Sequence, residues 1–88
     1  MAELNCLKVR VLQALDHRGW LNPPAAATLV GFQPARAMYS YMLRLHRWGL
    51  LERQHDSRGL LLYRLSLRGR ERLAWLMGIV RDGENAEN

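Results

Sequence analysis

Apolar residues recur at helical spacing near the start of the chain, between Glu3 and His17. This first stripe consists of Leu4, Leu7, Val11, Leu12 and Leu15. Residues three and four positions apart share one face of a helix, so the stripe predicts a first helix over residues 3–17. Gly19 follows at the point where such a helix would stop.

A second, shorter helix is predicted between Asn22 and Val30. Asn22 is a favourable N-cap, and the two prolines after it suit the first turn, where a missing amide proton costs nothing. Gly31 is able to adopt a left-handed backbone conformation and end the helix. We expect Phe32 to turn inward as a plug between helices.

The third helix is predicted over residues 33–48, with Pro34 in its first turn and Gly49 ending it. Its expected buried stripe is Ala35, Met38, Met42 and Leu45. Tyr39 and Tyr41 flank this stripe, and we expect both rings to pack on the core with the hydroxyl groups at the rim. Donation from these hydroxyl groups to phosphate is the alternative. Two helices joined by a short glycine-containing turn form a helix-turn-helix.

The pattern then changes from helical to extended. The segments 50–54 and 60–65 each begin with apolar residues and flank the turn-forming residues 55–59, which predicts a hairpin. Ser66 is a suitable cap for a last helix, whose apolar side carries Leu73, Leu76, Met77 and Val80. The predicted fold is mainly α with a small β-hairpin, a winged helix-turn-helix with a three-helix core, a wing and a C-terminal helix. Residues 1–80 form the domain, and the polar residues 81–88 are expected to be a disordered tail.

A known family has a similar order of residues across this region. The relevant residues are Tyr39, Met42, Arg44, Leu45, Gly49, Leu50, Leu51, Arg58, Gly59, Tyr63, Arg64, Leu65, Ser66, Gly69 and Arg70. This order, over roughly residues 33–73, resembles winged-helix bacterial transcription regulators of the PadR and MarR kind. The resemblance implies binding to double-stranded DNA, dimerisation through terminal helices, and a position for Tyr39 near the DNA surface.

Charge agrees with a nucleic-acid partner. The formal net charge is +5, from 13 Lys and Arg against 8 Asp and Glu, and Lys8 is the only lysine. Guanidinium groups favour bidentate contacts with phosphate and with guanine edges. The positive charge lies in the folded body, since Asp82, Glu84 and Glu87 make the end of the chain acidic.

The outer face of the third helix is the predicted DNA-contacting surface. It carries Arg36, Ser40, Leu43, Arg44 and Arg47, and no acid. We expect this helix to enter the major groove, with the wing, residues 54–60, against the flanking backbone or minor groove. A solvated helix face is the alternative.

Roles within this surface follow from position. Recognition helices contact base edges mainly with their N-terminal half, which assigns base contacts to Gln33, Arg36, Ala37 and Ser40. Arg44 and Arg47 are assigned to backbone oxygens, although Arg44 can reach either. Arg58 at the wing tip is assigned to a minor groove or its phosphates, and an exposed turn arginine is the alternative.

The last helix is apolar on a second side, because Trp75 and Ile79 project roughly opposite to Leu73, Leu76 and Val80. An exposed Trp and Ile together are typical of a partner surface, so we expect a homodimer through these residues. The alternative is that Trp75 folds back onto the first helix.

Catalysis and metal binding are not expected. Asp16 is adjacent to His17, but no nucleophile or glycine-rich phosphate loop accompanies this acid and imidazole. Cys6 is the only cysteine, and its spacing from the histidines does not form a zinc motif. We therefore expect no cofactor, and no pocket for a small-molecule ligand is evident.

The pattern also predicts where the protein acts. Apolar runs such as Leu60–Tyr63 are too short to cross a membrane, and residues 1–6 lack the features of a secretory signal. We expect a cytoplasmic protein without membrane contact. The main alternative to DNA binding is a winged helix that binds another protein, because the same fold serves both uses.

Overall fold

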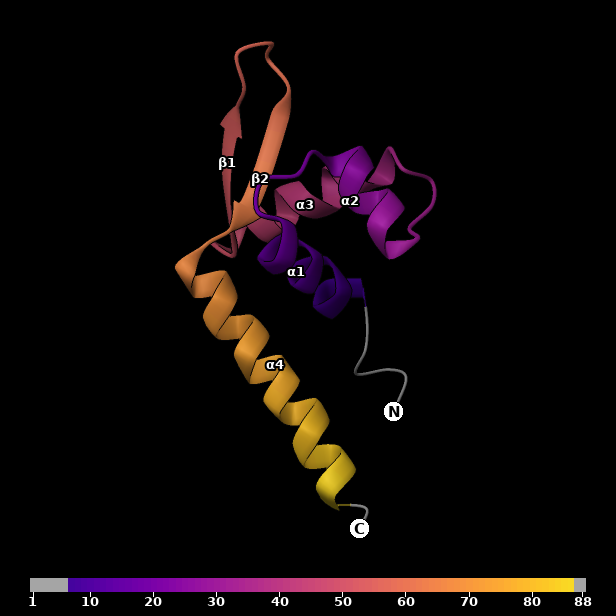
Figure 1. Ribbon diagram of the computed structural model, residues 1–88, viewed down its shortest axis with the longest axis vertical. Coiled ribbons are helices and arrows are strands. Elements are labelled where there is room, and N and C mark those ends of the chain that lie inside the picture. Colours follow the sequence, from indigo (N-terminus) through magenta and orange to yellow (C-terminus); the bar gives the residue numbers. More distant parts are fainter. Residues whose placement is uncertain (1–6, 87–88) are drawn as a thin grey trace.

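The computed structural model describes the backbone of residues 7–86 and the side chains of residues 7–78. Within this range the chain forms helices and one two-stranded hairpin (Figure 1). The elements are α1 (Leu7–Arg18), α2 (Pro23–Val30), α3 (Ala37–Arg47), β1 (Leu51–His55), β2 (Leu61–Leu65) and α4 (Leu67–Ala86). This order confirms the expected winged helix-turn-helix fold. The first residues of the predicted first helix, 3–6, lie outside the described residues.

Both ends of α2 are closed as the sequence predicts. The Asn22 side chain accepts a hydrogen bond from the Ala25 amide at 2.8 Å, which satisfies one of the unpaired N–H groups at the helix start. At the other end Gly31 has a φ of 71°, and the Phe32 amide donates to the Ala27 carbonyl at 2.9 Å. Phe32 packs partly buried against the core. The chain is thereby turned sharply from α2 toward α3.

The start of α3 differs from the prediction. The helix begins at Ala37, because residues 34–36 form a tight turn whose carbonyls accept bonds from amides three positions later, such as Ala37 N to Pro34 O at 3.0 Å. Pro34 therefore lies in this turn and not in the first turn of the helix. Ala35 is exposed, so its assignment to the buried stripe is wrong. A turn of the 3₁₀ type has three residues per turn, which puts Ala35 out of phase with the helix that follows.

The rest of the predicted stripe is confirmed. Met38, Met42 and Leu45 each have a relative exposure of 0% and pack α3 against the body. Burying a side chain of this size stabilises a fold by about 1.5–3 kcal/mol. The core that they join contains Val9, Val11, Leu12, Leu15, Ala26, Ala27, Leu50, Leu51, Tyr63, Leu65 and Leu73. The orientation of α3 about its own axis is therefore set by its inner side.

The hairpin forms the wing. Its strands pair antiparallel, with Leu51 opposite Leu65 and His55 opposite Leu61, each strand beginning one residue later than predicted. A further pairing was not predicted: Leu21, in the loop between α1 and α2, exchanges two backbone hydrogen bonds with Tyr63, at 2.9 and 2.8 Å. The middle of β2 is thus bonded on both sides, which anchors the base of the wing to the helical body.

Helix α4 extends away from the body on the side opposite the wing tip (Figure 1). Its first half packs on α1, with Leu73 buried and Gln13 Nε2 donating to Met77 Sδ at 3.2 Å. The helix runs to Ala86, whereas the sequence predicts that it ends near residue 80. The predicted boundary between the domain and the tail therefore does not coincide with the end of a helix. No helix in residues 7–86 is both long and apolar enough to cross a membrane.

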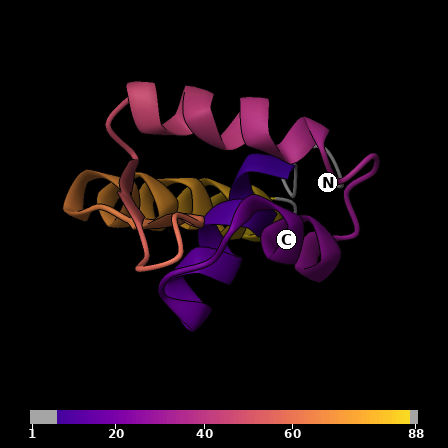
Figure 2. The same ribbon diagram turned by 90° about the horizontal axis from the view of Figure 1, so that it is seen from above.

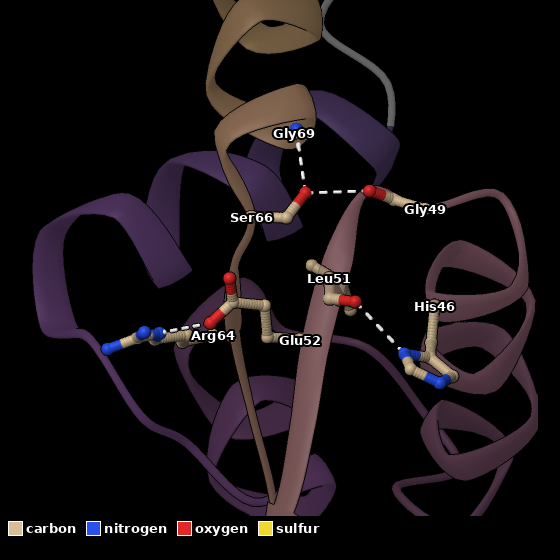
Figure 3. Close-up of polar contacts among 7 residues, drawn as sticks. All are labelled: His46, Gly49, Leu51, Glu52, Arg64, Ser66 and Gly69. Atoms are coloured by element: carbon tan, nitrogen blue, oxygen red, sulfur yellow. Dashed lines mark hydrogen bonds and ion pairs between the residues drawn. The ribbon is translucent and has the colours of Figure 1, made fainter.

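Three segments meet where α4 begins (Figure 3). The Ser66 hydroxyl donates to the Gly49 carbonyl at 2.7 Å and accepts from the Gly69 amide at 2.9 Å, which confirms Ser66 as the cap. The Ser66 amide donates to the Leu50 carbonyl at 3.0 Å, and Gly69 packs directly on the same carbonyl. The end of α3, the base of β1 and the start of α4 are therefore held at one junction.

The close approach of Gly69 predicts a large effect of one added methyl group. A Cβ at this position would lie well inside the van der Waals distance of the Leu50 carbonyl oxygen. We expect Gly69→Ala to lower the free energy of unfolding by about 1–3 kcal/mol, measured by urea unfolding. Gly78→Ala on the same helix is the control, because no atom lies within 4 Å of its added Cβ. That control should be neutral or stabilising by up to about 1 kcal/mol, and equal effects at the two positions would contradict the close contact.

Candidate nucleic-acid interface

The side of α3 opposite its buried stripe lies on the surface of the molecule. Seen from above, α3 runs along one edge, and α1 and α2 lie on its other side (Figure 2). Ser40, Arg44 and Arg47 are exposed along this face, and Arg36 is exposed at the position just before the helix. The structure therefore places four of the predicted DNA-contacting residues on one surface. We call Arg36, Ser40, Arg44 and Arg47 the outer face of α3.

Gln33 and Ala37, which are also predicted to contact bases, are positioned differently from the residues of the outer face. Gln33 is exposed in the turn before α3, so it is not a helical residue as the predicted span of 33–48 requires. Ala37 is the first residue of the helix and is half-buried. The turn consequently presents Gln33 and Arg36 ahead of the helix.

The arginines of the outer face have no acidic partner among the described residues. The two ion pairs found there join Arg64 to Glu52 at 2.6 Å and Arg70 to Asp16 at 3.7 Å, both away from this face. The Arg36 side chain does not cap the helix either. A solvated helix face usually mixes both charge signs, whereas this one presents only positive charge to an incoming ligand.

The C-terminal end of α3 is tied to the wing through His46. Its Nδ1 lies 2.9 Å from the Leu51 carbonyl oxygen, and since a carbonyl only accepts, this nitrogen carries the proton (Figure 3). The imidazole also meets the buried Tyr63 ring edge-on, with the ring centroids 6.1 Å apart. These contacts give the helix and the hairpin a defined relative position.

The tip of the wing is held by Asp56. Its carboxylate accepts hydrogen bonds from the amides of Arg58 at 2.8 Å and Leu60 at 2.9 Å, an arrangement common where Asp begins a turn. Gly59 has a φ of 84°, a left-handed conformation that suits glycine. Arg58 is exposed at this tip and forms no ion pair with any described residue. The backbone that carries Arg58 is thus internally bonded.

Sequence reasoning gave no role to the exposed Arg53, and its expectation for Tyr39 differs from the structure. Arg53 is exposed on β1 and pairs in register with Tyr63. Its position in the alternating pattern of the strand was the only signal available. Tyr39 is 45% exposed, so the expectation of a core-packed ring is wrong for it, whereas Tyr41 is half-buried with its ring 6.4 Å from that of Phe32.

The second apolar side of α4 is partly described. Trp75 is 58% exposed, and the Arg72 guanidinium carbon lies 5.3 Å from the centroid of its ring. Trp75 therefore does not fold back onto α1, which excludes that alternative. The side chain of Ile79 lies outside the described residues.

Asp16 and His17 both lie on the surface at the end of α1. Asp16 is exposed and lies 3.7 Å from the Arg70 guanidinium, and His17 is also exposed. Among the residues that the structure describes, no three His, Cys, Asp or Glu side chains gather as a metal site would require.

No family model and no curated protein matches the chain, whereas several solved structures do. The YusO protein from Bacillus subtilis matches with a TM-score of 0.79 and 19% identity, over 99% of this chain and 63% of that chain. A MarR-family transcriptional regulator from Silicibacter pomeroyi matches with a TM-score of 0.76 and 19% identity, over 99% and 60%. RV1404 from Mycobacterium tuberculosis matches with a TM-score of 0.72 and 29% identity, over 98% and 62%.

These similarities establish the fold as that of MarR-type winged-helix regulators. The predicted resemblance to MarR-type regulators is confirmed at the level of the fold. The predicted resemblance to PadR-type regulators stays a prediction. The chain spans 60–63% of the length of these three structures. The fold alone does not identify which residues contact a ligand.

The bonding at the wing tip predicts that Asp56 keeps the turn ordered. Asp56→Ala removes the acceptor for both amides, so we expect the amide protons of Arg58 and Leu60 to exchange about 2- to 12-fold faster per lost bond. Asp56→Asn keeps one carbonyl oxygen and should retain most of the protection. Hydrogen exchange measured by NMR tests this, and unchanged protection in Asp56→Ala would show that the backbone alone holds the turn.

Proposed function

We propose that this protein is a double-stranded DNA-binding transcriptional regulator that places α3 in the major groove. The observation that carries the proposal is the outer face of α3, which presents arginines without acidic partners among the described residues. The opposite side of the same helix is fully buried. Neighbours described as transcriptional regulators support a regulatory role over a catalytic one. The major groove of B-DNA is about 12 Å wide and admits one α-helix.

In this arrangement the turn and first residues of α3 lead into the groove. Arg36 and Ser40, with Gln33 and Ala37 beside them, are positioned to face base edges, while Arg44 and Arg47 face backbone oxygens. Arg58 at the wing tip contacts the flanking minor groove or its phosphates. The bonded turn at Asp56 supports this role, because it limits the entropy lost when Arg58 is held in place.

A winged helix that binds another protein is the competing function. The distinction is in the salt dependence, since a duplex held through several phosphates loses affinity steeply as salt rises. Selection of bound sequences from a random duplex pool gives a second criterion. Enrichment of a motif supports a regulator that reads sequence, and failure to enrich any motif favours the protein-binding function.

We expect Arg36→Ala combined with Arg44→Ala to abolish specific duplex binding, or to weaken it by at least about 30-fold. The lost Arg36 contact to a base costs about 1–3 kcal/mol, and the lost Arg44 hydrogen bond to a charged phosphate costs about 1.5–3 kcal/mol. Affinity is measured by fluorescence anisotropy on the selected duplex, and circular dichroism checks that the fold is unchanged.

The matched control is Arg10→Ala with Arg18→Ala, which removes the same charge from exposed positions on α1. Arg10 and Arg18 line a surface hollow formed by residues of α1 and α2, with none from α3, so we expect affinity to stay within about a factor of three. Equal losses of affinity in the two double variants would show that net charge, and not the position of the arginines, causes the loss. Unchanged affinity in the α3 variant would reject α3 as the recognition helix.

We also propose that the regulator acts as a homodimer through α4, with Trp75 and Ile79 at the interface. The exposed Trp75 ring supports this, since a large exposed apolar side chain is typical of a partner surface. A two-fold dimer would present two recognition helices to a palindromic site.

Trp75→Gln is expected to shift the protein from dimer to monomer, measured by sedimentation velocity at micromolar concentration. Leu67→Gln is the control, because Leu67 is 72% exposed on the same helix. A monomeric wild-type protein, or a Trp75 variant as dimeric as the wild type, would reject this interface.

A further inference from the structure

Cationic residues from three helices lie at the corner where α3 ends. Lys8 comes from the first turn of α1, Arg47 is the last residue of α3, and Arg68 lies in the first turn of α4. The corner itself is formed by Trp48 and Gly49, which follow α3. We refer to Lys8, Arg47 and Arg68 as the cationic corner.

Lys8 is placed at this corner by an aromatic contact. Its Nζ lies 4.8 Å from the centroid of the Trp48 ring, within the range of a cation–π interaction. Trp48 is 50% exposed, so the ammonium group is held near the surface and not in the core. The four-carbon stem of lysine is flexible, which allows the charge to move from the ring to a nearby anion without a change of the backbone.

Arg68 reaches the corner from the other side. Its Cδ and Nη1 would each lie 3.5 Å from a Cβ placed on Gly49, so the side chain lies along this glycine. The helix that carries it is fixed there, since the Ser66 hydroxyl bonds the Gly49 carbonyl at 2.7 Å. Arg47 is exposed one residue before Trp48.

The charge of the corner is not neutralised by the protein. None of the three side chains forms an ion pair with any residue in the described part of the chain. Gathering like charges from separate elements disfavours the folded state unless an anion is bound among them. The π face of Trp48 offsets this repulsion only for Lys8. The arrangement fits a ligand that carries a single concentrated negative charge, such as a phosphate group.

The position of the corner identifies the source of that phosphate. Trp48 and Gly49 come shortly before β1, and Ser66 follows β2, so the corner lies at the base of the wing, where α4 begins (Figure 1). A duplex that lies along the outer face of α3 reaches the end of this helix beside the corner, where Arg47 is exposed. The C-terminal end of a recognition helix is where backbone contacts are found in homeodomains.

We propose that the cationic corner binds a backbone phosphate of the duplex beside the base of the wing, with Lys8 moving from the Trp48 ring to that phosphate. This inference rests on the proposed function. It adds contacts from α1 and α4, so that helices outside the helix-turn-helix also position the duplex. Such contacts set register and affinity without reading sequence.

The experiment measures how the dissociation constant for duplex DNA depends on salt, for the wild-type chain and for Lys8→Gln combined with Arg68→Gln. Each phosphate contact contributes about 0.9 to the slope of log affinity against log salt. We expect the slope to fall by about two in the double variant, with the same loss of affinity on specific and random duplexes. Lys8→Arg, which keeps the charge, should retain the slope.

Arg72→Gln is the matched control, because Arg72 makes the same kind of contact with Trp75, at 5.3 Å, farther along α4. Its slope should equal that of the wild type. A second readout uses the variant Trp20→Phe with Trp75→Phe, in which Trp48 is the only tryptophan. Its emission should change when duplex is added, and Lys8→Gln should remove that change.

The outcomes distinguish a failure of the cationic corner from a failure of the proposed function. A wild-type slope retained in the double variant would overturn the cationic corner and leave the role of α3 intact. A loss of affinity with unchanged slope, together with lower thermal stability, would assign Lys8 and Arg68 a purely structural role and overturn it as well. Absence of duplex binding by the wild type would reject the proposed function and the corner together.

Discussion

The backbone carbonyl of Leu50 accepts a hydrogen bond from the Ser66 amide and lies directly against Gly69, and the positions of three elements depend on this contact. Only a residue without a side chain allows α4 to approach so closely. The Ser66 hydroxyl adds a bond to Gly49, so the end of α3, the base of the wing and the start of α4 share one junction. A surface built on α3 and the wing therefore keeps its shape relative to α4. In a dimer formed through α4, the same junction would determine how far apart the two recognition helices lie.

The two sides of α3 have separate physical roles. Met38, Met42 and Leu45 are fully buried and determine which way the helix is turned, since rotating it would expose them. The arginines on the other side are then held at the surface without acidic partners among the described residues. Packing energy thus maintains an arrangement of charge that would otherwise repel itself. A polyanion along this face relieves that repulsion, which is the physical basis of the proposed DNA binding.

Local signals in the sequence were sufficient where a short-range interaction decides the structure. Asn22 caps α2 and Gly31 ends it as predicted, because both effects involve residues within five positions of each other. The start of α3 was misplaced because proline suits a tight turn as well as a first helical turn, and only the observed bonding of residues 34–36 distinguishes them. Ala35 was wrongly assigned to the core for the same reason. Tyr39 and Tyr41 flank the stripe alike in the sequence, yet only Tyr41 meets another ring, that of Phe32.

The sequence by itself determined the order of elements, the buried stripe from Met38 to Leu45 and the arginine face opposite to it, because helical periodicity encodes all three. Only the tertiary structure determined which residues distant in the sequence are in contact: Leu21 with Tyr63, Gly69 with Leu50, and Lys8 with Trp48. These pairs are separated by 19 to 42 residues. No local pattern specifies them, since such contacts depend on how the elements pack around a shared core. The outer face of α3 was therefore foreseeable, whereas the cationic corner became visible only in the folded chain.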